Sequence, residues 1–274
     1  MICLKILSSA VSADEKIVER IMSTIDEIEH KEHVKILHCV ESGSRAWGFA
    51  SPDSDYDVRF IYIREPGFYL KLEKTRDVIE WQLDDVYDIN GWDIKKALQL
   101  LHSSNPTLFE WNNSPIVYKT TPEWNSLNCL VSEYFCSKSG LHHYLSTAKS
   151  NYREYLRTDM VRLKKYFYVV RPLLACRWIL DKKCAPPMLF SELAEAELPD
   201  ELIDPVNYLL DMKIHSPEIT ECPRVEVINR YIEREFELIS EEIIKHKDSE
   251  TKSWQLLNDC FLHLVDGYSD ICSK

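Results

Sequence analysis

The stretch of sequence that decides the fold is Glu41-Ser-Gly-Ser-Arg-Ala-Trp-Gly-Phe-Ala-Ser-Pro-Asp-Ser-Asp-Tyr-Asp-Val-Arg-Phe60. An apolar run precedes it at Val34–Val40 and another follows at Val58–Ile63, and both runs predict strands. Between them, the Gly43-Ser44 pair predicts a tight turn. Such a turn frees backbone N–H groups, which can then approach a phosphate. The stretch therefore predicts a phosphate-binding turn between two strands.

Two acids of the same stretch predict a metal site. Asp55 and Asp57 lie two residues apart at the start of the second strand, so their side chains project from one face. Two carboxylates held so close repel unless a cation lies between them, and carboxylate oxygens suit Mg²⁺ or Mn²⁺. The alternative is a solvated polar turn, to which we assign Asp53 beside Pro52. Asp57 lies in an apolar strand, where a carboxylate needs a partner.

The composition limits the class of protein. A chain of 274 residues, 45% of them hydrophobic, can bury one large core or two smaller ones. It contains no apolar window of about 20 residues, so no membrane span is expected. The nine cysteines show no C-x-x-C pair and are interpreted as reduced thiols of a cytoplasmic protein, not as a disulfide frame or zinc site. A net charge of −12 argues against a chain coated in nucleic acid.

One helix and several strands are predicted before Gly91. The capping-box pattern Ser12-x-x-Glu15 predicts a helix start. Isoleucines at helical spacing continue this helix, namely Ile17, Ile21, Ile25 and Ile28. Strands are expected at about 34–40, 56–64, 78–83 and 86–89, and a short helix at Ser44–Gly48.

After Gly91 the pattern changes. From Trp92 onward the apolar period is 3.6 residues, which predicts helices interrupted at prolines, including Pro172. Strands first and helices later predict an α+β fold. We expect residues 1–118 to form the catalytic domain and residues 119–274 an α-helical domain. The acidic amphipathic stretch after Val225 is predicted to be a core helix.

These motifs resemble a known superfamily. Gly43-Ser44 followed by Asp55-x-Asp57 on a strand resembles the signature of the DNA polymerase β nucleotidyltransferases. The longer motif, Gly-Ser-Arg-Ala-Trp-Gly-Phe with Ser-Asp-Tyr-Asp-Val-Arg, resembles that of the YcgL-type proteins. These form the RNA-ligase-associated polymerase family assigned to RNA repair. Further matching segments are Gly91–Leu98, Ser104–Pro106, Glu110-Trp111, Ser114–Tyr118, Lys164–Phe167 and Arg171-Pro172. The resemblance implies a polymerase-β-like palm, a mixed sheet with flanking helices, followed by a helical domain that completes the nucleotide and acceptor cleft.

The resemblance also implies a reaction. A nucleotidyltransferase of EC 2.7.7 type moves an NMP from an NTP, such as ATP, to an acceptor hydroxyl and releases pyrophosphate. Two Mg²⁺ or Mn²⁺ ions would bind the attacking and leaving oxygens. Asp55 and Asp57 would hold these ions together with a third acid on a neighbouring strand, for which we choose Asp88. Asp84, Asp85 and Asp93 compete with it, and Asp93 can instead cap the next helix.

Basic residues are the candidate substrate ligands. Gly43 and Ser44 would bind the triphosphate, and Arg45 would add charge-assisted bonds or form a surface salt bridge. Trp47 is interpreted as a packing residue. From the Lys-Lys-Tyr-Phe…Arg-Pro block, Lys165 and Arg171 are the expected nucleotide contacts.

A basic stripe is a second signal. Between residues 149 and 183, ten lysines and arginines face three acids. Lys149, Arg153, Arg157, Lys164 and Arg171 recur at intervals of four and seven, so one unbroken helix would present them on one face. The first three are the expected contacts of an RNA acceptor. The alternative is a solvated helix face.

Three hypotheses about function follow. The first is transfer of a nucleotide to an RNA end during RNA repair. The second keeps the chemistry but changes the acceptor to a protein, as in minimal nucleotidyltransferase antitoxins, or to a small molecule, as in antibiotic-modifying relatives. The third is a non-catalytic nucleotide-sensing module. The acidic composition favours the second, the basic stripe favours the first, and an intact set of acids argues against the third.

Overall fold

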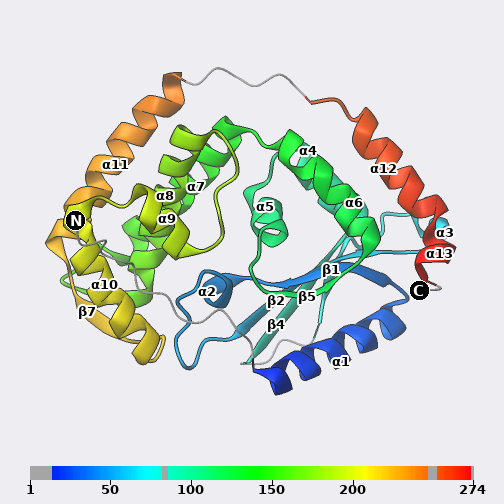
Figure 1. Ribbon diagram of the computed structural model, residues 1–274, viewed down its shortest axis with the longest axis horizontal. Coiled ribbons are helices and arrows are strands. Elements are labelled where there is room, and N and C mark those ends of the chain that lie inside the picture. Colours follow the sequence, from blue (N-terminus) through cyan, green and yellow to red (C-terminus); the bar gives the residue numbers. More distant parts are fainter. Residues whose placement is uncertain (1–13, 82–85, 246–251, 273–274) are drawn as a thin grey trace. The chain divides into compact units, whose positions relative to one another are not determined.

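The computed structural model describes residues 14–81, 86–245 and 252–272 (Figure 1). These residues form an α+β structure, with a mixed five-stranded sheet and helices in the N-terminal part and a mostly helical C-terminal part. The predicted fold class is therefore confirmed. Within the described ranges, no helix has the length and apolar character that crossing a bilayer requires.

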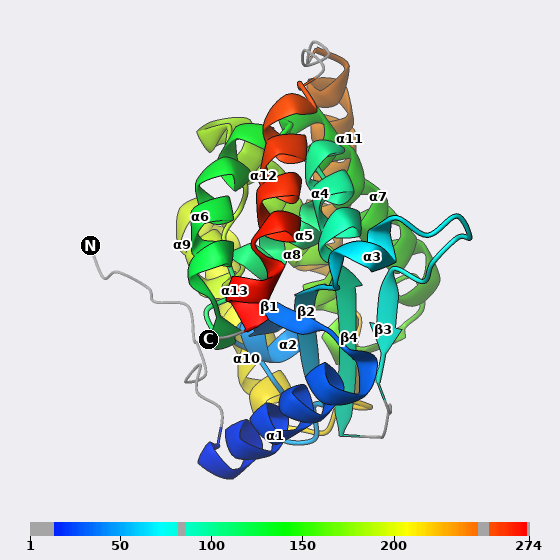
Figure 2. The ribbon, with the colours of Figure 1, turned by 90° about the vertical axis from the view of Figure 1, so that its right-hand side faces the viewer.

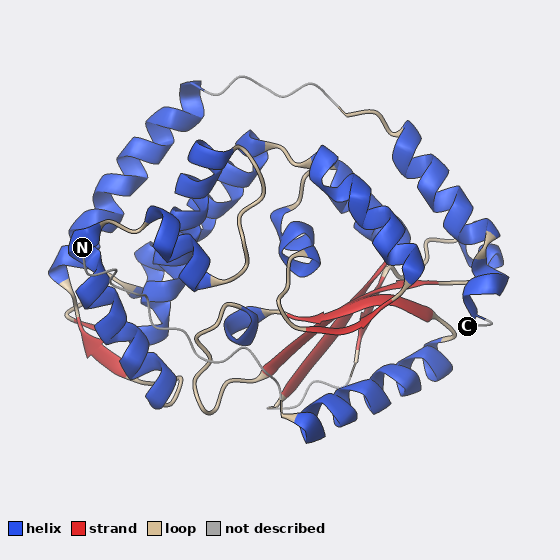
Figure 3. Cartoon of the chain, in the orientation of Figure 1, coloured by secondary structure: helices blue, strands red, loops and turns tan. Residues whose placement is uncertain are grey.

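The sheet, red in Figure 3, has the strand order β3-β4-β2-β1-β5. Strands β2 and β4 are parallel, and every other neighbouring pair is antiparallel. The first two predicted strands are confirmed. The end of the third predicted strand lies outside the described residues, as do Asp84 and Asp85, which follow it. The strand bounds are β1 Lys35–Glu41, β2 Tyr56–Ile63, β3 Val78–Glu80, β4 Tyr87–Asp93 and β5 Val117–Thr120.

Helix α1, Glu15–Glu32, lies beside this sheet, as Figure 2 shows. Ile21, Ile25 and Ile28 are fully buried against a core that β1 and β2 share, so the helical isoleucine spacing predicted the correct face. The helix is capped by Asp14, whose side chain accepts a hydrogen bond from the Lys16 backbone N–H. The predicted cap Ser12 lies outside the described residues.

The helix predicted from Trp92 begins later, at Ile94, because β4 continues through Gly91. Gly91 pairs with Phe60 of β2, and a Cβ at Gly91 would lie 2.1 Å from the Phe60 ring. Close strand packing therefore requires this glycine, which the local pattern indicated as a break. Asp93 caps α4, Ile94–His102, by accepting a hydrogen bond from Lys95 N at 2.8 Å, so the capping alternative for Asp93 is confirmed.

Short helices connect the strands, and long helices form most of the rest of the chain. The predicted core helix after Val225 is α11, Glu226–Lys245, which buries Ile228, Ile232 and Ile239. The remaining elements are α2 Gly43–Ala46, α3 Pro66–Tyr69, α5 Pro106–Asn112, α6 Pro122–Val131, the 3₁₀ helix η1 Ser132–Tyr134, α7 Ser137–Tyr155, β6 Met160–Arg162, α8 Leu163–Lys182, α9 Phe190–Glu197, α10 Asp200–His215, β7 Glu221–Pro223, α11 Glu226–Lys245, α12 Gln255–Asp266 and α13 Tyr268–Cys272.

Two predictions about the helical part were wrong. The basic stripe does not lie on one helix, because the chain leaves α7 after Tyr155 and forms β6, which pairs with β7, before α8 begins. Arg157 therefore lies in a connection. Pro172 does not break a helix but lies inside α8. A proline there removes one backbone hydrogen bond, and the extensive burial of α8 compensates for that loss.

The chain divides into two compact units that interleave along the sequence. The helical unit contains Ser44–Ser54 and the described residues from Phe135 to Lys245. The sheet unit contains the described residues up to Gly43, then Asp55–Tyr134, and those from Lys252 onward. The functional division between residues 118 and 119 is a separate matter and stays a prediction.

Candidate functional site

Two of the predicted acids meet on the sheet unit. Asp57 of β2 and Asp88 of β4 are register partners on parallel strands, and we call them the acidic pair. Arg59 lies two residues after Asp57, on the same face of β2. Its Nη2 donates hydrogen bonds to Asp57 Oδ1 at 2.8 Å and to Asp88 Oδ2 at 2.6 Å. The two carboxylates therefore converge on one point, which a guanidinium nitrogen occupies.

The turn at Gly43 lies directly against this pair. Gly43 has a φ of +61°, and a Cβ there would lie 1.8 Å from Asp57 Oδ2. Only glycine permits both this conformation and this close approach. The fully buried Glu41 accepts a hydrogen bond from Asp57 N at 2.8 Å and another from the Tyr118 hydroxyl. The turn thus lies against the Asp57 side chain, while a buried acid that sequence reasoning missed bonds to the Asp57 backbone.

The acidic pair fits a divalent cation by its chemistry, because both donors are carboxylate oxygens and a cation already bridges them. Asp55 precedes the first residue of β2 and is exposed. The structure does not gather the three acids into one group: among the described residues, no three His, Cys, Asp or Glu side chains form a cluster that could hold a metal ion. The structure thus brings together Asp57, Asp88 and Gly43, and Asp55 does not form a metal-binding group with the two other acids.

Ser44 and Arg45 belong to the helical unit, where both bond to the loop that follows. The buried Ser44 hydroxyl donates to Ser54 Oγ at 3.2 Å. Ser54 Oγ in turn donates to Glu218 Oε1 at 2.7 Å, and Arg45 Nη2 donates to the Ser54 carbonyl. Residues of the predicted phosphate turn are therefore tied to the loop that ends before Asp55.

A buried lysine completes this arrangement. Lys213 of α10 is 2% exposed, and its Nζ donates to Ser51 Oγ at 2.7 Å and lies 3.7 Å from Glu218 Oε1. Lys164 Nζ lies 2.6 Å from the other Glu218 oxygen. Burial lowers the pKa of Lys213. Sequence reasoning missed this group of residues, since its contacts join positions up to 164 residues apart. The group consists of Ser51, Ser54, Lys164, Lys213 and Glu218.

The two nucleotide contacts expected on α8 are engaged inside the helical unit. Arg171 is buried, donates from Nε and Nη2 to the Met188 carbonyl at 3.3 and 3.1 Å, and stacks over Trp47. Trp47 packs against the core, as interpreted from the sequence. Lys165 Nζ lies 3.9 Å from the Tyr155 ring centroid, and burial lowers the pKa of this lysine.

The three expected acceptor contacts lie on the surface of the helical unit. Lys149 and Arg153 are exposed on α7, and Arg157 is exposed in the connection that follows. Lys149 Nζ also donates to Ser240 Oγ at 2.9 Å. The three charges are available to a partner, although one helix does not carry them all.

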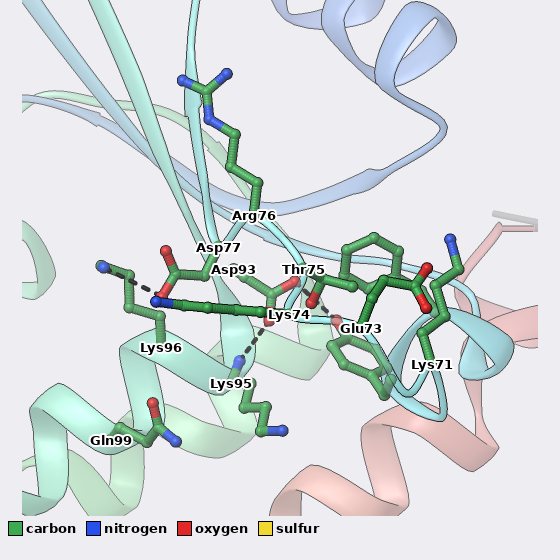
Figure 4. Close-up of a pocket in the computed structure, with 12 residues that line it drawn as sticks. Lys71, Glu73, Lys74, Thr75, Arg76, Asp77, Asp93, Lys95, Lys96 and Gln99 are labelled. Atoms are coloured by element: carbon green, nitrogen blue, oxygen red, sulfur yellow. Dashed lines mark hydrogen bonds and ion pairs between the residues drawn. The ribbon is translucent and has the colours of Figure 1, made fainter.

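The sheet unit also has a pocket of about 240 Å³ at the far end of β4 (Figure 4). Asp93 lies in its wall, accepts hydrogen bonds from Tyr69 Oη and Lys95 N, and has a pKa that burial raises to about 6. Figure 4 shows Lys71 and Arg76 extending away from Asp93. Asp93 lies five positions after Asp88 along the strand, which is about 16 Å. This pocket is therefore not part of the acidic pair.

The two comparisons made by sequence agree with the motifs. A sequence profile described as the RNA repair pathway DNA polymerase beta family matches residues 17–263. The "Uncharacterized protein YcgL" of Bacillus subtilis (strain 168) is 42% identical over 256 residues, 90% of this chain and 96% of that protein. A solved nucleotidyltransferase-like protein from Exiguobacterium sibiricum 255-15 covers 93% of this chain and 89% of its own, with 10% identity and a TM-score of 0.32. The profile spans the Gly43 turn and the acidic pair, and it confirms the resemblance drawn from the sequence.

Proposed function

The chain belongs to the RNA repair pathway DNA polymerase beta family, and on this basis we propose that it is a metal-dependent nucleotidyltransferase that adds an NMP from an NTP to the hydroxyl of an RNA 3′ end. The observation that carries the proposal is the meeting of Asp57 and Asp88 on parallel strands, against a turn at Gly43 that admits no side chain. This arrangement combines a carboxylate pair with a turn that carries no side chain at a strand end.

The acidic pair would hold the divalent cation in this proposal, with Asp55 as a further ligand. When bound, Mg²⁺ or Mn²⁺ stabilises the attacking and leaving oxygens of an in-line displacement at phosphorus. Glu41 would keep the Asp57 backbone in place by accepting a hydrogen bond from its N–H. The family pattern assigns the triphosphate to Gly43, Ser44 and Arg45, with Lys165 and Arg171 as further basic residues.

The acceptor is proposed to be RNA because of the family description and the exposed cations Lys149, Arg153 and Arg157. Transfer to a protein or to a small molecule is the second candidate, favoured by the net charge of −12. A purely nucleotide-sensing role is disfavoured, because it would not require two carboxylates at adjacent register positions.

The test is nucleotidyl transfer with each α-labelled NTP, a short RNA and Mg²⁺ or Mn²⁺. We expect Asp57→Ala to lower the rate by at least about 10³-fold, since it removes a ligand of the cation. Asp88→Asn should impair transfer and leave NTP binding largely intact. The matched control is Asp93→Asn, an acid of the same strand that bonds to Tyr69 and Lys95. We expect near-normal transfer from this variant, compared at equal folded fraction.

Two results would contradict the assignment. One is an Asp57→Ala variant that keeps more than about a tenth of the wild-type rate. The other is an exchange of phenotypes, with Asp93→Asn impaired and Asp88→Asn silent. If a protein or a small molecule is labelled and RNA is not, the proposed nucleotidyl transfer stands. The acceptor is then that of the second candidate and not RNA.

A further inference from the structure

Arg59 occupies a position that the proposed reaction does not yet explain. Its side chain is 16% exposed and lies inside β2, among apolar residues of the central strand. Nη2 bonds to both carboxylates of the acidic pair, while Nη1 donates to the backbone carbonyls of Asp88 at 2.7 Å and Val58 at 3.1 Å. The guanidinium is therefore fixed to both strands, by two different nitrogens.

The two nitrogens have separable functions. Like charges at directly paired positions of neighbouring strands destabilise a sheet, and a guanidinium between them removes that repulsion. An arginine keeps its charge at every pH a protein experiences. A divalent cation held by the acidic pair would need oxygens of both carboxylates, and Nη2 already occupies one oxygen of each, Asp57 Oδ1 and Asp88 Oδ2. Guanidinium and metal would therefore compete for the same two carboxylates.

We propose that Arg59 is the resident counter-ion of the acidic pair and competes with the divalent cation for its oxygens. This inference rests on the proposed function, since it concerns the same site. On metal binding, Nη2 releases the two carboxylates, while the Nη1 bonds to the two carbonyls keep the side chain beside them. Arg59 thus acts as a positioning residue. It preserves the strand pairing in the absence of metal and weakens the binding of a free metal ion.

The competition has a consequence for substrate binding. A released guanidinium beside a divalent cation leaves excess positive charge at the site. A triphosphate brings the negative charge that offsets it. The site should therefore bind the metal together with the nucleotide more readily than the metal alone.

The experiment is a titration of the full chain with Mn²⁺, without nucleotide, followed by calorimetry and by the electron paramagnetic resonance signal of free Mn²⁺. We expect Arg59→Met to bind Mn²⁺ at least about tenfold more tightly than the wild type, because a competing unit charge is gone. The control is Arg64→Met, which removes the same charge just beyond the other end of β2, where Arg64 contacts Glu32. It should stay within about twofold of the wild type.

A second readout follows thermal unfolding. In a chelator, Arg59→Met should melt below Arg64→Met, because the acidic pair then repels itself. Mn²⁺ should raise the melting temperature of Arg59→Met more than that of the wild type. Arg59→Lys keeps a charge but loses the two-nitrogen fork, so its Mn²⁺ affinity should lie between the wild type and Arg59→Met. It replaces Arg59→Met in the titration if that variant fails to fold.

The inference is overturned if Arg59→Met binds Mn²⁺ as weakly as the wild type or more weakly. This failure is separate from that of the proposed function. If the wild type transfers nucleotides normally but the order of Mn²⁺ affinities is reversed, only the proposed role of Arg59 is contradicted. If the Mn²⁺ affinities follow the expected order but no NMP is transferred to any acceptor, only the proposed reaction is contradicted.

Discussion

Both units contain a cluster in which one cation joins groups from distant segments, and the clusters differ in their access to water. In the sheet unit, Arg59 joins Asp57 and Asp88, whose side chains are 22% and 38% exposed. In the helical unit, Lys213 is 2% exposed, against 16% for Arg59, and joins Ser51, which is 3% exposed, to Glu218, which is 23% exposed. Water or a metal can replace a lost partner at the first cluster. A buried group that loses its partner has no such replacement. We therefore call Arg59 with Asp57 and Asp88 the exchangeable cluster, because water or a metal can replace a partner there. We call Lys213 with Ser51 and Glu218 the structural cluster.

Outside the acidic pair itself, the largest expected effect comes from closing the space beside the exchangeable cluster. Gly43→Ala places a methyl group where Asp57 Oδ2 now lies, at a φ that alanine adopts only with strain. We expect transfer to fall by about 10²-fold, the loss that a displaced reacting group typically causes. Mn²⁺ titration of the same variant should show weakened binding.

The matched control for this variant is Gly67→Ala in α3 of the same unit. The nearest heavy atom to its added Cβ is 3.8 Å away, which is an ordinary contact. It should transfer nucleotides at the wild-type rate. If Gly43→Ala behaves like Gly67→Ala, the turn does not support the acidic pair, and the first half of the comparison fails.

A smaller effect is expected at the structural cluster. Lys213→Met removes the donor to Ser51 and one of the two cations beside Glu218. The free energy of unfolding, measured by urea denaturation, should fall by about 2 kcal/mol, the usual cost of leaving buried polar groups without a partner. Lys182→Met is the control, since that lysine pairs with Asp181 on the surface of the same unit and should be close to wild type. Equal stability of the two variants would show that burial does not separate the clusters.

The smallest effect concerns cations that bond to neither cluster. Reversal of Lys149, Arg153 and Arg157 to Glu should weaken binding of a short single-stranded RNA. It should also reduce the log–log salt slope by roughly 0.7 for each lost phosphate contact. Filter binding at several salt concentrations measures both. The control reverses three other exposed cations of the helical unit, which gives the same change in net charge: Lys182, Lys183 and Arg230. If both triple variants bind alike, the three residues are only a solvated surface, and an acceptor other than RNA is favoured.

Much of the sheet could be predicted from local pattern. The isoleucine spacing of α1 and the apolar runs of β1 and β2 are short-range signals, and these elements form where they were predicted. The choice of Asp88 also followed from its place in a strand-like segment, and the structure puts it beside Asp57. Arg59 was overlooked although Asp57-x-Arg59 contains its signal, since alternation alone places the two side chains on one face.

The remaining features depend on contacts that no local window contains. Lys213 and Glu218 reach a loop more than 160 residues earlier in the chain. Gly91 predicts the end of a strand because glycine often marks a break, yet its pairing with Phe60 keeps it inside β4. The basic stripe lies on one face only if its helix is unbroken, and nothing within residues 149–171 indicates that β6 interrupts it by pairing with β7.

The interleaving of the two units has a consequence for how this protein can be divided or recombined. Ser44–Ser54 packs as part of the helical unit but is joined at both ends to segments of the sheet unit. No single cut of the chain can release either unit whole. A fragment that starts after Tyr134 would keep Lys213 and Glu218 without Ser51 and Ser54. To exchange the helical unit with that of a relative, two separate gene segments must therefore be replaced together. Neither unit can be transferred between genes as one continuous segment.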